Sequence, residues 1–162
     1  MNGGGAADAA VFVISWLNGE AVLALRDTLT GSETITSYYA DVNLDGQSNG
    51  GTEDTVSGGE YNLYCLISGN SFSCGNLVPA ALKASGTVTL LGQRSGGGSC
   101  VVLPCTSASG AIFAISGPKQ LATVRNGSFY NIDEGIDPDF ILFRTESYYD
   151  RPALVEYIHS LK

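Results

Sequence analysis

A short apolar segment that leads through a serine- and glycine-rich turn into a helix constrains the fold more than any other part of the sequence. Residues 61–67 read Tyr-Asn-Leu-Tyr-Cys-Leu-Ile, which predicts a buried strand, and residues 75–84 predict a helix that ends before Gly86. The turn between them, residues 68–76, reads Ser-Gly-Asn-Ser-Phe-Ser-Cys-Gly-Asn. A strand followed at once by a helix is typical of folds in which helices pack on a sheet.

Further helices and strands are expected on both sides of this segment. Residues 6–17 predict a helix that is apolar almost all round and therefore buried on most sides, while residues 41–60 predict a polar loop. The dipeptide Asn126-Gly127 is the strongest signal for a two-residue hairpin turn. Strands are expected at residues 33–40, 87–91, 100–103, 111–116, 120–125 and 128–132, and a last helix with Asp150 near its start at 152–162. We therefore predict an α/β fold with a mixed sheet, flanking helices and a late β-hairpin.

The composition limits the classes of partner. The chain has 162 residues, enough for one domain with a core, and 21 glycines, which suggest many tight turns or close backbone approaches. Sixteen acidic residues against eight basic ones give a net charge of −8, and no cluster of Lys or Arg occurs. Nucleic acids and anionic membrane surfaces are therefore poor partners, and no apolar run reaches the roughly 18 residues of a transmembrane helix.

The turn at residues 68–76 is the first candidate for chemistry. A serine at a junction between a strand and a helix lies beside free backbone N–H groups, which together with the helix dipole favour a developing negative charge. This is the logic of a nucleophile elbow, although Ser73-Cys74-Gly75 matches only the second half of the Gly-x-Ser-x-Gly pattern. The alternative is that Ser71 or Ser73 only caps the helix.

A glycine run, Asn2-Gly3-Gly4-Gly5, precedes the first predicted helix. Consecutive glycines at a helix start let backbone N–H groups approach an anion closely, whereas the alternative is a flexible leader. Together with the serine turn, the run predicts one site made of a nucleophile and an oxyanion hole.

The polar loop matches the opening of a calcium-binding loop, with oxygen ligands at positions 1, 3 and 5 and Gly46 at position 6. Position 12, where a carboxylate is needed, is Thr52, so Glu53 or Asp54 would have to supply it after a short insertion. The alternative is a solvated acidic loop. The candidate calcium ligands are Asp41, Asn43, Asp45 and Gln47.

The four cysteines and the single histidine give weaker signals. Neither a Cys-x-x-Cys pair nor a cluster of Cys and His occurs, which argues against a zinc site. Disulfides and buried free thiols both remain open for the cysteines, and Cys100 and Cys105 would bridge only if the segment between them bends back. We expect His159 to be a surface residue rather than a catalytic base.

Four segments occur in a fixed order: Asn2-Gly3-Gly4-Gly5, the serine turn, Leu-Gly-Gln-Arg-Ser-Gly-Gly-Gly at residues 91–98, and Gly-Ile-Asp-Pro-Asp at residues 135–139. The first resembles the end of the Asp-Leu-Arg-x-Asn-x-Gly-Gly segment of the S41 peptidases, and the second resembles their nucleophile turn. The third and fourth resemble their Gly-x-x-Thr-x-Gly and Gly-Ile/Val-x-Pro-Asp segments. The ordered set is more specific than any one of its members.

The resemblance implies a mixed sheet like that of ClpP and crotonase, in which residues 1–162 form a single domain that is a fragment of a larger S41-like catalytic domain. It implies a serine endopeptidase that hydrolyses peptide bonds through an acyl-enzyme on Ser73. One oxyanion donor would be the N–H of Cys74 and the other that of Gly4 or Gly5. Peptides or proteins would be the substrates and no cofactor would be required, with calcium as the candidate ion. An extracytoplasmic or secreted location is expected because it is common in the family.

The sequence departs from the family pattern at the general base. Members with a Ser-Lys pair carry a lysine at the last position of the glycine segment, where this sequence has Gly98. The other arrangement resembles that of tricorn, with a serine, a histidine and a glutamate that orders the pair. Glu134 is the candidate acid and Asp133 the reserve.

The tricorn-like histidine would lie upstream of the glycine run. We expect Met1 to lie inside a longer protein, because an apolar helix begins almost at once, and we expect the remainder of that protein to supply the base. Without a base the serine hydroxyl has a pKa far above 7 and is a weak nucleophile. The isolated chain is therefore expected to have little or no peptidase activity.

Two other functions remain open. A catalytically incomplete S41-like domain would bind peptides or a partner protein without cleaving them, with calcium ordering residues 41–54. A serine hydrolase of the α/β-hydrolase type would use a late histidine, for which only His159 is available. The incomplete elbow and the segment at residues 135–139 argue against the second of these.

Overall fold

Two β-sheets and the helices packed against them make up the described part of the chain. The computed structural model describes residues 2–47, 54–56 and 61–161. In chain order the elements are α1 (Ala7–Asn18), β1 (Ala21–Asp27), β2 (Glu33–Tyr38), β3 (Leu63–Ile67), α2 (Cys74–Ala84), β4 (Val88–Gly92), β5 (Cys100–Thr106), β6 (Ile112–Arg125), β7 (Ser128–Tyr130), β8 (Phe140–Ile141), the 3₁₀-helix η1 (Thr145–Tyr148) and α3 (Arg151–Ser160).

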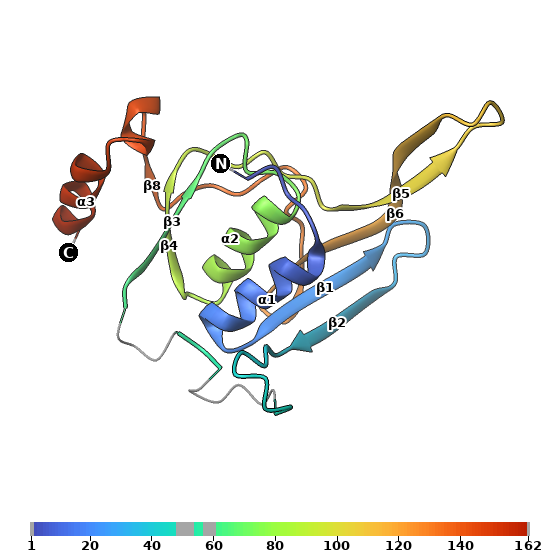
Figure 1. Ribbon diagram of the computed structural model, residues 1–162, viewed down its shortest axis with the longest axis horizontal. Helices are drawn as coiled ribbons and strands as arrows, with labels where there is room; N and C mark the ends of the chain where they lie inside the picture. The colour runs from blue at the N-terminus through green and yellow to red at the C-terminus, as the bar shows by residue number, and fades with distance from the viewer. Residues whose placement is uncertain (1, 48–53, 57–60, 162) are drawn as a thin grey trace.

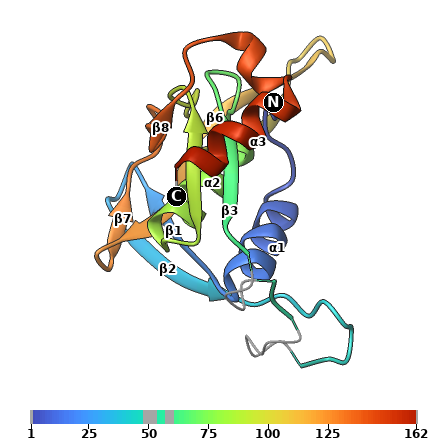
Figure 2. The ribbon, with the colours of Figure 1, turned by 90° about the vertical axis from the view of Figure 1, so that its left-hand side faces the viewer.

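The larger sheet is antiparallel and has the order β2-β1-β6-β5, with β7 paired to β6. β5 and the first half of β6 form a two-stranded hairpin that projects from the rest of the molecule (Figure 1). The smaller sheet is parallel and has the order β3-β4-β8 (Figure 2). Helix α2 contacts strands of both sheets and also packs against α1.

Helix α2 lies at the centre of the hydrophobic core. Its Leu77 and Leu82 are buried together with Ile14 of α1, Leu90 of β4 and Ala122 of β6. Burial of this apolar surface is the main favourable contribution to folding. The serine turn therefore connects a strand of the parallel sheet to the most firmly packed helix of the structure.

The predicted α/β class with a mixed sheet is confirmed, and so is the late hairpin. Asn126 and Gly127 have φ angles of 53° and 76°, and both are positive, as a two-residue turn of this kind requires. The last helix begins as expected, because the Asp150 side chain accepts a hydrogen bond from the Ala153 N–H at 3.1 Å.

The sequence did not predict strand β1, which is central in the larger sheet. Its sequence, Ala-Val-Leu-Ala-Leu-Arg-Asp, is rich in Ala and Leu, which favour helices. Burial between β2 and β6 outweighs this local preference, since Ala21, Leu23 and Ala24 are almost completely buried. The two strands predicted at 111–116 and 120–125 are one continuous strand, β6.

The prediction that the first helix is buried on most sides is wrong. Only Ala10, Ile14 and Ser15 of α1 are buried, while Phe12 and Trp16 are 44% and 38% exposed. The strand predicted as buried at 61–67 covers only residues 63–67, and of these only Ile67 is buried, because β3 forms an edge of the parallel sheet. No helix in the described ranges combines the length and the apolar character needed to cross a membrane.

Candidate active site

Ser73 lies where the serine turn meets α2, in a backbone conformation that residues other than glycine seldom adopt. Its φ is 55° and its ψ is −125°. Such a conformation costs about 1–3 kcal/mol and persists only where the surroundings impose it. The Ser73 side chain forms no capping hydrogen bond with α2, so the capping alternative is wrong for this residue.

Backbone hydrogen bonds on both sides hold Ser73 in this conformation. The Ser73 N–H donates to the Gly97 carbonyl at 2.8 Å, and the Gly96 N–H donates to the Ser71 carbonyl at 2.9 Å. The Ser73 carbonyl accepts the N–H of Asn76, at 2.8 Å, in the first turn of α2. The strained residue is thus fixed between the glycine loop at 96–98 and the core helix.

Ser71 closes the turn instead of capping the helix. Its buried hydroxyl accepts the N–H of Ser68 at 3.2 Å, and its own N–H donates to the Ser68 carbonyl at 2.8 Å. The capping alternative is therefore wrong for Ser71 as well.

The glycine run at residues 3–5 packs directly on Ser73. A Cβ atom on Gly4 would lie 2.7 Å from Ser73 Cβ and 2.9 Å from the Phe72 carbonyl oxygen, and the φ of Gly4 is +103°. The Phe72 N–H donates to the Asn2 carbonyl at 3.2 Å, which fastens the run to the turn. Only glycine fits at position 4, and the structure brings the two predicted motifs together.

Two backbone N–H groups beside Ser73, those of Gly5 and Cys74, have no acceptor within the described residues. The Gly4 N–H, in contrast, donates to Asn2 Oδ1 at 2.9 Å. The Cys74 thiol donates to the Gly5 carbonyl at 3.2 Å and so connects the two segments that carry the free N–H groups. Free N–H donors at the start of a helix, next to a serine, are suited to stabilise an oxyanion.

An apolar cavity of about 210 Å³ adjoins Ser73. It is lined mainly by apolar and small residues next to Ser73 and Cys74. The other lining residues are Gly5, Ala7, Leu77, Gly98, Ser99, Cys100, Val101, Val102 and Leu121. None of these residues carries a charge, so the cavity is suited to an uncharged, apolar side chain.

Residues 1–142 match the sequence model of peptidase family S41. The chain belongs to peptidase family S41. A protein of Chlamydia pneumoniae is 31% identical over 101 residues, which cover 62% of this chain and 16% of that protein.

Two solved structures of similar fold are peptidases or are described as such. The photosystem II D1 C-terminal processing protease has a TM-score of 0.64 and 22% identity, over 87% of this chain and 32% of that one. A putative peptidase from Parabacteroides merdae has a TM-score of 0.67 and 18% identity, over 99% of this chain and 49% of that one. The predicted fold class is confirmed, and the chain spans less than half the length of these proteins.

The position that would carry the lysine of a Ser-Lys S41 pair is a glycine in the left-handed conformation, with the Phe72 ring packed against it. Gly98 has a φ of +81°, and a Cβ atom there would lie 2.6 Å from Cε2 of the Phe72 ring. The aromatic ring takes the space into which a longer side chain would extend. The Ser-Lys arrangement of the S41 family therefore has no counterpart at this position.

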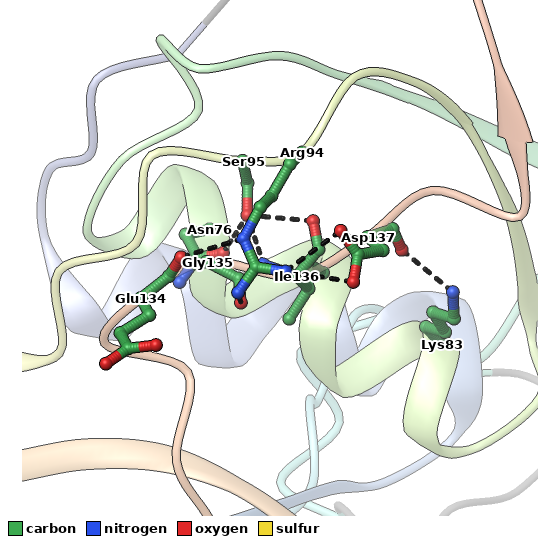
Figure 3. A network of polar contacts seen from close by, with 8 residues as sticks. All are labelled: Asn76, Lys83, Arg94, Ser95, Glu134, Gly135, Ile136 and Asp137. Carbon is green, nitrogen blue, oxygen red and sulfur yellow. Dashed lines mark hydrogen bonds and ion pairs between the residues drawn. The ribbon is translucent and has the colours of Figure 1, made fainter.

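The two candidate acids differ in their surroundings. Glu134 is exposed, and its carboxylate points away from the neighbouring polar groups (Figure 3). Asp133 is half-buried, and its Oδ1 accepts both the N–H and the hydroxyl of Ser99, each at 2.8 Å. Because Ser99 lines the cavity beside Ser73, Asp133 reaches the site through one intervening residue, whereas Glu134 does not. The role of an ordering acid stays a prediction for either residue.

A buried polar network that the sequence did not predict joins α2 to the family's two signature loops (Figure 3). Asn76 is completely buried, donates to the Ile132 carbonyl at 2.9 Å and accepts the Ser95 hydroxyl at 2.6 Å. Ser95 Oγ in turn accepts the N–H of Ile136 at 2.7 Å. No periodic pattern distinguishes a buried amide of this kind from an exposed one, and only the tertiary contacts identify it.

Charged residues extend the network toward the surface. Arg94 donates to the carbonyl of Glu134 at 3.1 Å and to both carboxylate oxygens of Asp137 at 2.9 Å (Figure 3). Lys83 of α2 donates to the Asp137 carbonyl and pairs with Asp139, both at 2.8 Å. These contacts fix the loop at 133–139 against the glycine loop and the nucleophile-bearing helix.

The predicted calcium ligands lie together in a loop but contact its backbone. Asp41 accepts the N–H groups of Asp45 and Gly46 at 3.1 and 2.9 Å, and Asn43 Oδ1 accepts the same Asp45 N–H at 3.0 Å. No group of three acidic, Cys or His side chains suited to a metal occurs in the described ranges, whereas Thr52 and Glu53 lie outside them. The backbone N–H of Gln47 donates a hydrogen bond to Asp45 Oδ1 at 2.8 Å. Calcium binding therefore stays a prediction.

The cysteines are free thiols, which decides the question left open by the sequence. Cys100 and Cys105 lie on the same extended strand, β5, which does not bend back to join them. Burial raises the pKa of the Cys65 thiol above its usual value. His159 is exposed on α3, as predicted for a surface residue.

Replacing Gly4 by alanine tests the close packing on Ser73. We expect the free energy of unfolding to fall by about 2 kcal/mol, because alanine is disfavoured at this φ and its methyl group would overlap Ser73. Urea denaturation followed through Trp16, the single tryptophan, measures the change. The control is Gly5→Ala, whose Cβ would have no neighbour within 4 Å. Equal stability of the two variants would contradict the described packing.

Ser95→Ala tests the buried network. The variant leaves Asn76 Oδ1 and the Ile136 N–H without their shared partner, so we expect a loss of about 2 kcal/mol in urea denaturation. Ser128→Ala removes an exposed hydroxyl that has no hydrogen bond in the described chain and should be close to neutral. A neutral Ser95→Ala would mean that the network contributes nothing to stability.

Proposed function

We propose that the chain carries the nucleophile and the oxyanion hole of a serine endopeptidase that forms an acyl-enzyme on Ser73. The observation that supports this most is the Ser73 backbone, strained yet fixed by hydrogen bonds, with a side chain that caps nothing. Strain of this kind is concentrated at functional sites, and a structural serine at a helix start would ordinarily cap the helix.

In the first step Ser73 Oγ attacks the carbonyl carbon of the scissile peptide bond, and the hydroxyl proton passes to a general base. The carbonyl π electrons move to the oxygen, and the tetrahedral intermediate is stabilised by hydrogen bonds from Cys74 and Gly5. Loss of one such donor typically costs about 100- to 1,000-fold in rate. The free Gly5 N–H and the occupied Gly4 N–H favour Gly5 as the second donor.

In the second step the C–N bond breaks, and the amine leaves with the proton held by the base. Water then attacks the Ser73 ester, its proton passes to the same base, and the carboxylic acid leaves as the Ser73 hydroxyl is restored. The cavity beside Ser73 would hold an apolar side chain next to the scissile bond. The described residues that line this cavity include no Lys or Arg.

The general base in this proposal is a histidine from the remainder of a longer protein, upstream of these residues. The residues lining the Ser73 cavity include no His, Lys, Asp or Glu that would serve instead. The isolated chain is accordingly proposed to have little or no turnover. An extracytoplasmic or secreted location stays a prediction from the family.

A binding module that grips peptides without cleaving them is the second candidate. The observation that favours it is the glycine at position 98, where Ser-Lys members of the family carry their lysine base and where the Phe72 ring packs in this structure. A histidine in the remainder of the protein, placed near Ser73, would favour the peptidase over the binding module.

The test is labelling with a fluorophosphonate, which reacts with activated serines. In the full-length protein we expect the label on Ser73, found by peptide mapping, and Ser73→Ala should lose the label together with at least about 1,000-fold in kcat/KM on peptides. Ser128→Ala, which removes an exposed hydroxyl, is the matched control. Equal labelling of wild type and Ser73→Ala would overturn the proposal. Strong Ser73-dependent turnover by residues 1–162 alone would contradict the proposal that the general base comes from upstream of these residues.

A further inference from the structure

A second cavity adjoins the one beside Ser73. It has a volume of about 340 Å³ and lies between α1 and the strands β1 and β2. Ala7 and Leu121 line both cavities, so the two share a wall. We call the second cavity the aromatic groove, and its main walls are Val11, Phe12, Leu23, Tyr38 and Tyr39.

The aromatic groove exposes large side chains that the core does not cover. Phe12, Tyr38 and Tyr39 are 44%, 42% and 44% exposed, and Trp16 stacks on Phe12 with a distance of 6.3 Å between ring centroids. A gathering of exposed aromatic side chains on a protein of this size marks a surface that binds something. The shared residues Ala7 and Leu121 place the groove next to the Ser73 cavity, close enough for one extended ligand to contact both.

The charges around the two cavities have one sign. Asp8 and Asp41 line the aromatic groove, and neither cavity has a Lys, Arg or His among its lining residues. Asp8 is exposed and takes part in no ion pair of the described chain. The Asp41 carboxylate accepts only backbone N–H groups there, and the whole chain carries a net charge of −8. A ligand with a positive charge near this groove is favoured and an acidic one is repelled.

We propose that the aromatic groove is a second substrate subsite, which selects polypeptides with an aromatic or large apolar residue next to a Lys or Arg, a few residues from the scissile bond. The inference rests on the proposed function, because it places the neighbouring apolar side chain in the cavity beside Ser73. An extended peptide advances about 3.3 Å per residue, so a groove that shares a wall with the first cavity lies within reach of the same strand. Phe12 is a specificity residue in this account, and Asp8 selects for charge.

The experiment uses the full-length protein and fluorogenic peptides that differ at one position. The two peptides of the first pair have Phe or Ala at the position expected to enter the aromatic groove. The two peptides of the second pair keep this Phe and have Lys or Glu next to it. Binding to the Ser73→Ala variant is measured by fluorescence anisotropy, and turnover by wild type gives KM and kcat. The binding assay tests peptide selection by the aromatic groove even where no peptide is cleaved. A failure of the proposed peptidase function is therefore distinguished from a failure of the proposed peptide selection.

The expected preference is about three- to fivefold in affinity for Lys over Glu, and added salt should reduce it because the carboxylates are exposed. Asp8→Asn should remove most of this preference, while Glu156→Gln, which deletes an exposed charge on α3, should not. Phe12→Ala should lower the affinity for the Phe peptide about fivefold and leave the affinity for the Ala peptide unchanged. In the turnover assay the same variant should raise KM without lowering kcat.

Three results would overturn the inference. The first is equal affinity for the Lys and Glu peptides at every salt concentration. The second is a Phe12→Ala variant that binds the Phe peptide as tightly as its parent. The third is a change of oligomeric state, without a change in peptide preference, when Phe12 or Asp8 is replaced. That outcome would assign the groove to contact with a second copy of the chain.

Discussion

The hydrogen bond between the Ser73 N–H and the Gly97 carbonyl is the contact on which the rest of the site depends. It fixes the strained serine to the loop at 96–98 at the point where α2 begins. The same loop is held from its other side, because the Gly98 N–H donates to the Asp133 carbonyl at 2.9 Å. Three segments that are far apart in the sequence therefore meet at the loop at 96–98.

The strain at Ser73 is balanced by order around it. The Ser73 backbone costs about 1–3 kcal/mol, while the helix that follows is part of the core and the Asn76–Ser95 network is buried and fully paired. A buried network rigidifies its surroundings only when every member has a partner. The glycine run adds a further constraint, because Gly4 packs so closely on Ser73 that no side chain fits at position 4. Rigid placement of the nucleophile and the N–H donors is what stabilisation of a developing charge requires.

Much of this arrangement could be predicted from the sequence because it depends on the preferences of neighbouring residues. The serine turn, the Asn126-Gly127 hairpin and the Asp150 cap follow from residue types at fixed offsets. Strand β1 was missed because its Ala and Leu residues favour a helix locally, and only the pairing with β2 and β6 makes it a strand. Asn76 and Ser95 were missed for a related reason, since burial and hydrogen-bond partners come from segments that are distant in the sequence. The fit of Phe72 against Gly98 is likewise a property of the assembled fold.

The central claim is that Ser73 and the N–H groups of Cys74 and Gly5 form one catalytic site. A crystal structure of the full-length protein after reaction with a fluorophosphonate tests it most directly, because the phosphonyl oxygen occupies the place of the oxyanion. We predict a covalent bond to Ser73 Oγ, with the phosphonyl oxygen about 2.7–3.1 Å from both nitrogens. An adduct on another residue, or a phosphonyl oxygen that faces solvent, would contradict it.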